Sequence, residues 1–510
     1  MPLISARKSI NSGYQKFRHG KIRSIIWPIR SFELSKFTPM ACLMFSILLN
    51  QNIVRSLKDS LIMTQMGVEV INFIKLWCEM PLGVIFVLVY SKLCNISSSE
   101  KAFRWVISFF LLFYIVFAFL LYPCRDIIHP SVTLINQLIL EYPNLKWFIL
   151  MWGKWSFVIM YALGELWPLV VFSLLFWQLA NKITKIDEAT RFYPFFAVLG
   201  QANALIAGSI IMYCSSDSNI LSPFFSNITD KTEVVIKSLT LVVVLTGAVI
   251  IYIQKYIDTK IIVPAKISAN NKANSTKIKV SFLDSIKLII QYPYLLFIAM
   301  IIILYNLSSN MIEGMWMYKI KESFPTMQGF INYQGEVLFW VGGATIFFAV
   351  IGSTLIKKFG WFSAAILTPF AMISTGILFF LGVINSKSIY YLTTVTSVLS
   401  PALLILSMGT IQYIFTKGLK FSLCDATREM LYIPMPSHVK THGKAAVDIV
   451  GTKIGKSIGA TIQILIFTIY PFCTYDDIAW VLMVIFTISC ILWIIVIFKL
   501  DRIFSEEISK

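Results

Sequence analysis

The class of fold is decided by residues 37–57, FTPMACLMFSILLNQNIVRSL, and by the charged knot that ends them, Arg55-Ser56-Leu57-Lys58-Asp59-Ser60. About 20 apolar residues are long enough to cross the hydrocarbon core of a bilayer. Charges at that depth are costly, so they usually face a water-filled cavity and bind something of opposite sign. A second knot, GTKIGKS at residues 451–457, interrupts another apolar stretch near the other end. The two knots predict a membrane protein with an anionic cargo.

The composition also indicates a membrane protein. Hydrophobic residues make up 57% of the 510 residues and charged residues 14%, whereas soluble globular chains contain about 25% charged residues. The net charge of +18 lies mostly in short connections, where it orients a protein in a bilayer, so we expect no nucleic-acid partner. The eight cysteines contain no C-x-x-C pair and the four histidines have no metal-ligand spacing. We therefore expect no disulfide framework, no metal and no cofactor.

The apolar runs predict an all-α, polytopic membrane protein. Twelve runs have transmembrane length: 37–57, 68–92, 103–122, 147–180, 192–214, 234–254, 290–317, 335–356, 361–384, 390–416, 443–470 and 478–499. The fourth run is overlong, so it is either strongly tilted or broken near Pro168. The segment 123–146 is interrupted by three prolines, and we interpret it as a loop with a short helix.

Lysine and arginine residues predict the orientation, with both termini cytosolic. We expect a basic cytosolic arm (1–36), a six-helix bundle (37–257), a basic cytosolic linker (258–284), a second six-helix bundle (285–499) and a cytosolic tail (500–510). The arm also has the composition of a mitochondrial-type presequence. The sequon Asn227-Ile228-Thr229 falls on the predicted outside. It is a weak glycosylation signal, because such sequons are frequent by chance.

A short internal echo supports two related halves. Glu188-Ala189-Thr190-Arg191 precedes the fifth run, and Asp425-Ala426-Thr427-Arg428 precedes the eleventh. Two similar six-helix halves form a major-facilitator-like arrangement, in which the substrate binds near the membrane midplane and access alternates as the halves rock.

Charged residues within or beside the apolar runs are the candidate site. The expected phosphate ligands are Lys58, Lys456 and Lys444, and the expected gating or charge-pairing residues are Glu165, Glu313, Asp59 and Asp448. The structural alternative is salt bridging that locks helices together without contacting a ligand. We favour that alternative for Lys75 and Glu79, which lie four residues apart on one helical face.

The knot at 451–457 is similar to a phosphate-binding Walker loop, but the match fails. Three residues separate Gly451 from Gly455, where a Walker loop requires four after a strand. Gly451, Gly455 and Gly459 instead have the spacing of small residues that allow close helix packing. The lysines of this knot can still meet phosphate as point charges.

Several ordered blocks resemble the ATP/ADP translocases of obligate intracellular parasites and plastids. These blocks are Arg55–Leu61, Phe73–Trp77, Glu165–Trp167 with Ser173–Trp177, Arg191–Pro194, Glu313–Trp316, Arg428–Met430 with Tyr432–Pro434, and Gly443–Asp448 with Gly455–Ser457. The resemblance implies import of ATP in exchange for ADP by alternating access, and it assigns roles to Lys58, Glu165, Glu313 and Lys456. The chain departs from the family pattern at Pro168, at Lys319, where a lysine is displaced, and at Ile458.

The charges predict a mechanism in which each half donates a lysine to the phosphates. Glu165 and Glu313 pair with the lysines while the site is empty, and nucleotide phosphates replace the carboxylates. The alternatives are a proton-coupled nucleotide symporter, in which Glu165 or Glu313 carries the proton, a transporter of another organic or inorganic phosphate, or a membrane scaffold. We expect no enzyme. The plasma membrane of an intracellular parasite is the first expected location and a mitochondrion-like organelle the second. Base selectivity and oligomeric state stay open.

Overall fold

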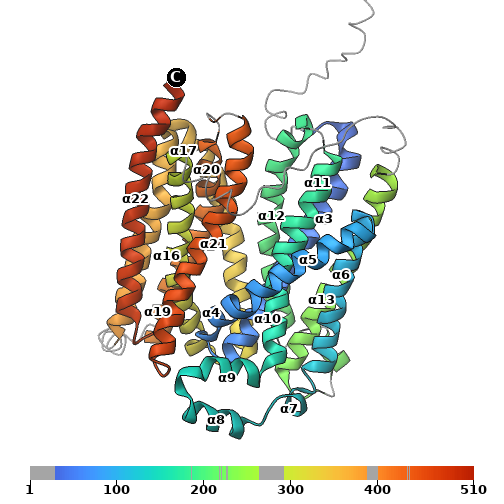
Figure 1. Cartoon of the computed structure of the whole chain (residues 1–510), viewed down its shortest axis with the longest axis vertical. Coiled ribbons are helices and arrows are strands. Elements are labelled where there is room, and N and C mark those ends of the chain that lie inside the picture. Colours follow the sequence, from blue (N-terminus) through green and yellow to red (C-terminus); the bar gives the residue numbers. More distant parts are fainter. Residues whose placement is uncertain are drawn as a thin grey trace, which may run out of the picture.

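The computed structural model describes residues 29–262, 292–386 and 400–509, except for 185, 217–218, 220, 226–227, 433–434 and 436. Within these ranges the regular elements are helices, and they form two bundles that stand side by side (Figure 1). Most of the predicted arm 1–36 and of the predicted linker 258–284 lies outside the described residues, as does Asn227. The two bundles match the order of the two predicted halves.

The first bundle, called the N-half, contains six helical passages, several of which run through π-helical turns. They are α3 (Leu34–Gln65), then α4 (Val70–Ile74) with η2 (Lys75–Glu79) and α5 (Met80–Ile96), α6 (Ser99–Val116) with η3 (Phe117–Leu121), α10 (Trp155–Trp167) with η5 (Pro168–Phe176) and α11 (Trp177–Ile183), α12 (Ile186–Ser215), and α13 (Lys231–Ile257) with η7 (Asp258–Ile262). A short 3-10 turn, η1 (Ser31–Glu33), precedes α3.

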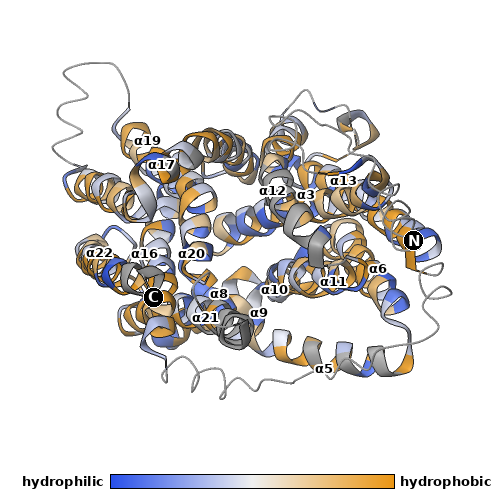
Figure 2. Ribbon diagram, turned by 90° about the horizontal axis from the view of Figure 1, so that it is seen from above, coloured by the Kyte–Doolittle hydropathy of each residue, from blue (hydrophilic) through white to orange (hydrophobic). Residues whose placement is uncertain are grey.

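The second bundle, called the C-half, repeats this order. Its elements are α16 (Pro293–Ser323), α17 (Met327–Ile384), α19 (Pro401–Leu419) with η8 (Lys420–Cys424) and α20 (Asp425–Leu431), α21 (Ser437–Ile469), and α22 (Ala479–Ser509). α17 covers two of the predicted runs, 335–356 and 361–384. The two are separated by a kink at Gly360, whose φ of +78° is a conformation that glycine adopts without steric cost. Seen from above, the two bundles stand apart from each other and α5 runs along the edge of the N-half (Figure 2).

Ten helical stretches of the described chain are long and apolar enough to cross a membrane. α12 and α21, of 30 and 33 residues, occupy the fifth and eleventh places in chain order. The described chain therefore has helices at all twelve expected places, and ten of these meet the criterion of length and composition for crossing a membrane.

Three predicted boundaries are wrong. α3 continues to Gln65, so the knot at 55–60 lies inside the first helix and not after it. The fourth run is broken at Lys154, which has φ −125° and ψ 43°, whereas the helix continues as η5 after Pro168. Residues 390–399 of the tenth run lie outside the described residues; the helix that follows begins at Pro401 and continues through η8 to Leu431, past the predicted end at residue 416. Ser400 fixes its start, because the Ser400 side chain caps the Leu403 N–H.

The proline-interrupted segment forms a small layer across one end of the bundles. It contains α7 (Arg125–Ile128), α8 (Val132–Glu141), the 3-10 turn η4 (Pro143–Leu145) and α9 (Lys146–Gly153), and Figure 1 shows it below the bundles. The predicted loop is thus mostly helical.

Hydrogen bonds between the halves gather at this same end. Ser60 donates to Gln334 at 3.1 Å, Asn72 to Gln463 at 2.9 Å, Ser215 to Asn332 at 3.0 Å, and Trp147 to the Phe467 carbonyl at 3.1 Å. α12 and α17 also approach closely here, because a Cβ on Gly208 would lie 2.5 Å from the Gly335 carbonyl oxygen. We call this the closed end of the molecule.

Candidate functional site

The N-half holds a buried lysine with three partners. Lys58 Nζ lies 2.6 Å from Asp59 Oδ1 and 2.5 Å from Glu165 Oε1, and its side chain is only 2% exposed. The same ammonium lies 3.8 Å from the centroid of the Tyr161 ring, within the range of a cation–π contact. The structure therefore brings Lys58, Asp59 and Glu165 together, with Asp59 on the same helix as the lysine.

A glycine makes room for this lysine. Gly164 is on α10 next to Glu165, and a Cβ at Gly164 would lie 2.7 Å from Lys58 Cδ and 3.2 Å from Val54 Cγ1. The stem of Lys58 occupies the space that a side chain would need. The first and fourth helices of the N-half are therefore shaped around the lysine.

The C-half holds a second lysine–glutamate pair, between α16 and α19. Lys417 forms an ion pair with Glu313, and the two side chains are 15% and 28% exposed. Lys417 Nζ lies 5.2 Å from the centroid of the Tyr413 ring. The sequence predicted Glu313 but missed Lys417, because the predicted tenth run ended at residue 416.

The two pairs occupy equivalent helices with exchanged charges. In the N-half the lysine is on the first helix, α3, and the glutamate on the fourth, α10. In the C-half the glutamate is on the first helix, α16, and the lysine on the fourth, α19. If Lys58 on the first helix pairs with Glu165 on the fourth, the two related halves suggest a lysine on the fourth helix of the C-half as the partner of Glu313. That comparison is the sequence signal that leads to Lys417.

Further charges connect the two pairs. Arg55 lies 3.9 Å from Asp59 and also interacts electrostatically with Glu313 and Tyr413 of the C-half. Lys75 and Glu79, both in η2, do not form the predicted salt bridge, because no contact within 4 Å joins their charged atoms in the described structure; they interact electrostatically with each other and with Glu165. We call this group the central charge cluster; its members are Arg55, Lys58, Asp59, Lys75, Glu79, Glu165, Glu313, Lys417 and Lys456.

Lys456 is an exposed cation of the central charge cluster, as is Arg55. It projects from α21 and is exposed. It interacts electrostatically with Glu165 and Glu313. Among the described residues no carboxylate lies within 4 Å of it. Glu313, which we expected to pair with Lys58 or Lys456 while the site is empty, forms its ion pair with Lys417 instead. Lys444 and Asp448 also belong to α21, but their side chains lie outside the described part of the structure.

Lysines at the closed end have structural partners of their own. Lys319, the displaced lysine of the sequence, lies 2.8 Å from Asp476 and 2.7 Å from Glu322. Lys146 donates to the Pro471 carbonyl at 2.8 Å and lies 4.4 Å from the centroid of the Trp147 ring. Burial lowers the pKa of Lys146. These contacts join the α9 layer and α16 to the loop that follows α21.

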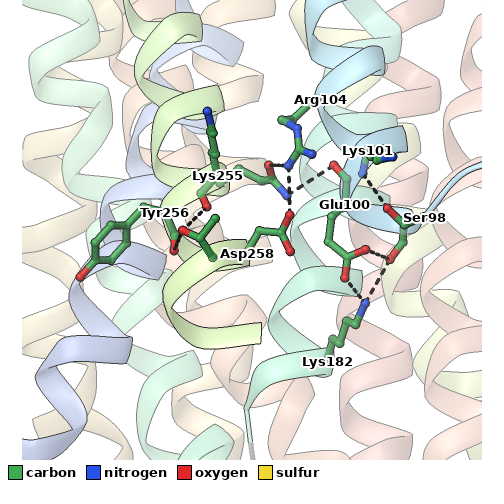
Figure 3. A network of polar contacts seen from close by, with 11 residues as sticks. Ser98, Glu100, Lys101, Arg104, Lys182, Lys255, Tyr256 and Asp258 are labelled. Carbon is green, nitrogen blue, oxygen red and sulfur yellow. Dashed lines mark hydrogen bonds and ion pairs between the residues drawn. The ribbon is translucent and has the colours of Figure 1, made fainter. Parts of the chain in front are cut away.

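A separate polar network joins α6, α11 and α13 at the opposite end of the N-half (Figure 3). Lys182 forms an ion pair with Glu100, and Arg104 donates to Gln254 at 2.8 Å and lies 3.3 Å from Asp258. All of these residues belong to the N-half, so the network ties three of its helices into one unit. It lies apart from the central charge cluster.

Comparisons with known proteins agree on one family and one fold. The family of TLC ATP/ADP transporters matches residues 13–504. ADP,ATP carrier protein 3 of Rickettsia typhi is 41% identical over 489 residues, which cover 94% of this chain and 97% of that protein. ADP,ATP carrier protein 5 of Rickettsia typhi is 37% identical, with 94% and 96% covered.

Solved structures of transporters share the fold at low identity. A bacterial homologue of the iron transporter ferroportin in an inward-facing state gives a TM-score of 0.54 at 13% identity, with 92% of this chain and 99% of that chain covered. A D-xylose-proton symporter gives 0.51 at 10% identity, with 91% and 97% covered. These likenesses confirm the expected major-facilitator-like architecture of a multi-pass membrane protein.

Proposed function

This chain belongs to the TLC ATP/ADP transporter family, and from that premise we propose that it exchanges ATP for ADP across a membrane by alternating access. The two Rickettsia relatives are named as ADP,ATP carriers, and each is matched over more than nine tenths of its length. The observation that carries the proposal is the central charge cluster, to which both halves contribute cations and in which Lys456 lacks a carboxylate contact among the described residues.

The cluster is suited to a polyphosphate because its other lysines are neutralised within the protein. Each buried pair would be costly to leave with one partner, so the empty carrier keeps Lys58 with Glu165 and Lys417 with Glu313. A nucleotide brings phosphate oxygens that form charge-assisted hydrogen bonds to ammonium groups. Lys456 meets the phosphates first, because it has no carboxylate contact to give up among the described residues. Lys444 and Asp448 precede Lys456 on α21 by about three and about two helical turns. They stay a predicted phosphate ligand and a predicted charge-pairing residue.

The direction of access follows from the closed end. The halves are joined there by side-chain and backbone hydrogen bonds, so the nucleotide reaches the cluster from the opposite end, where α3 begins and α22 ends (Figure 1). We assign that end to the cytosol, on the strength of the basic residues in segments 1–36 and 258–284. The bacterial plasma membrane is the proposed location.

The test is counter-exchange in liposomes that contain the purified protein. Vesicles loaded with ADP should take up labelled ATP, whereas vesicles without internal nucleotide should not, whether or not a pH gradient is imposed. Uptake driven by the pH gradient alone would favour the proton-coupled alternative and contradict exchange. Unlabelled phosphate and sugar phosphates, added in excess, should compete poorly against the labelled ATP.

Variants connect the activity to the cluster. Lys456→Ala and Lys58→Ala should abolish exchange while the protein still inserts in the membrane. Lys182→Gln is the matched control, because Lys182 also pairs with a buried glutamate of the N-half but belongs to the network of Figure 3. Normal exchange by Lys456→Ala would contradict the assigned site.

A further inference from the structure

We propose that Lys417 is a phosphate ligand of the carrier, held by Glu313 while the site is empty, and that Tyr305 adds a hydroxyl donor to the same subsite. The proposal rests on the proposed function, since it concerns nucleotide binding at the central charge cluster. It adds a C-half subsite on α16 and α19 to the lysine on α21.

The first argument is that Lys417 is held more loosely than its N-half counterpart. Lys58 has two carboxylates within 2.6 Å and an aromatic ring at 3.8 Å. Among the described residues Lys417 has one carboxylate contact, Glu313, and its nearest aromatic ring centroid, that of Tyr413, is 5.2 Å away. Lys417 also keeps more of its surface exposed, 15% against 2%. An incoming anion therefore displaces fewer contacts from Lys417 than from Lys58.

The second argument is that Glu313 keeps a positive neighbour when Lys417 leaves it. Arg55 reaches from the N-half into electrostatic range of Glu313. A buried carboxylate that loses its only cation is strongly destabilised, but here Arg55 remains. Lys417 can thus turn to a phosphate while the charge of Glu313 stays compensated. The exchange also couples the two halves, because Arg55 is on α3 and Glu313 on α16.

The third argument is an unsatisfied donor within electrostatic range of Lys417. The hydroxyl of Tyr305 is buried and has no hydrogen-bond partner in the structure, and the residue is 7% exposed. Tyr305 interacts electrostatically with Lys417, and Lys420 Nζ lies 5.9 Å from its ring centroid. Buried hydroxyls are normally hydrogen-bonded, so an orphan hydroxyl within electrostatic range of an exchangeable lysine indicates a place for an acceptor that arrives with the substrate.

These residues follow one line along the C-half. Tyr305 and Glu313 lie eight residues apart on α16, a rise of about 12 Å, while Lys417 and Lys420 face them from α19 and η8. The donors are therefore spread along the helix axis instead of converging on one point. This spread suits an extended chain of phosphates better than a single inorganic phosphate.

The experiment measures nucleotide affinity in the detergent-solubilised full chain by isothermal titration, with ATP, ADP and AMP as probes. Lys417→Gln should weaken ATP binding by about tenfold or more, since charge-assisted hydrogen bonds are among the strong ones. The loss should shrink from ATP to ADP to AMP. Lys417→Arg should recover most of the affinity, because it keeps the charge. Tyr305→Phe should weaken ATP binding by a few fold.

Matched controls separate binding from packing. Lys237 forms a comparable, half-buried pair with Glu233 on α13, outside the cluster, so Lys237→Gln should leave ATP affinity unchanged. If Lys417→Gln lowers only the thermal stability and binds ATP as the wild type does, Lys417 is a structural residue and the proposal is overturned. If the wild type itself binds no nucleotide, the proposed function fails first, which is a distinguishable result.

Discussion

The two lysine–glutamate pairs lie on equivalent helices of the two halves, yet their surroundings differ. In the N-half, Lys58 is surrounded by Asp59, Glu165 and the Tyr161 ring and is almost fully buried. In the C-half, Lys417 and Glu313 have fewer close contacts and more exposed surface. Two lysine–glutamate pairs on equivalent helices can therefore have different roles, because their surroundings differ. We infer that the N-half pair anchors the fold of its bundle, whereas the C-half pair exchanges partners with substrate.

The largest expected effect is on folding, and it separates the two lysines. Lys58→Met removes the ammonium at little change in side-chain length, so Glu165 loses its cation contact and Asp59 keeps only the 3.9 Å contact to Arg55. Breaking a buried pair in this way costs about 3–5 kcal/mol. Lys417→Met should cost less than half as much, because Lys417 has one carboxylate contact where Lys58 has two, and its side chain is more exposed. Thermal unfolding in detergent measures both, and equal losses would contradict the comparison.

A second prediction compares the two halves by swapping the lysine and the glutamate within each pair. Glu313→Lys combined with Lys417→Glu places a glutamate and a lysine in the arrangement that the N-half already has. It should recover more than half of the stability that Lys417→Glu alone removes. Lys58→Glu combined with Glu165→Lys should recover less than half, because the new glutamate adjoins Asp59. A double-mutant cycle on thermal stability gives the coupling in each half, and the opposite order would exclude our interpretation.

A third prediction uses the glycine that accommodates Lys58. Gly164→Ala puts a Cβ 2.7 Å from Lys58 Cδ, so the lysine stem must move away from Glu165. Overpacking of this kind costs about 1–3 kcal/mol, and exchange activity should fall with it.

Gly343→Ala is the matched control for that substitution. Gly343 is also in a transmembrane helix, and a Cβ there has one neighbour, Leu205 Cδ2, at an ordinary 3.9 Å. Gly343→Ala should therefore leave stability and exchange near the wild-type values. Activity in Gly164→Ala equal to that in the control would show that the position of Lys58 is not constrained by α10.

The fold could be predicted largely from the lengths of apolar runs, because the bilayer sets the length of a spanning helix. The errors arose where local geometry overrides composition. Lys154 breaks an apolar run by its backbone conformation, and Ser400 with Pro401 starts a helix inside another run. Neither effect changes hydrophobicity, so run length alone does not reveal it.

The site could be predicted in part, since charges within apolar sequence are rare and costly. That argument found Lys58, Asp59, Glu165 and Glu313, but it did not find the partner of Glu313. Lys417 lies 104 positions further along the chain and one residue past the predicted end of its run. Which charged residues face each other depends on how α16 packs against α19. The sequence of either helix alone does not determine that packing.

The smallest expected effect concerns the aromatic rings beside the two lysines. Lys58 Nζ lies 3.8 Å from the Tyr161 ring centroid, and Lys417 Nζ lies 5.2 Å from that of Tyr413. Cation–π attraction contributes about 0.5–2 kcal/mol and is larger where the cation is desolvated. Tyr161→Leu should therefore destabilise the protein more than Tyr413→Leu, by about 1 kcal/mol. The corresponding phenylalanine variants keep the rings and should stay close to the wild type in thermal stability. A greater loss in Tyr413→Leu would mean that the C-half lysine is held as firmly as the N-half one, and the division between an anchoring pair and an exchanging pair would then fail.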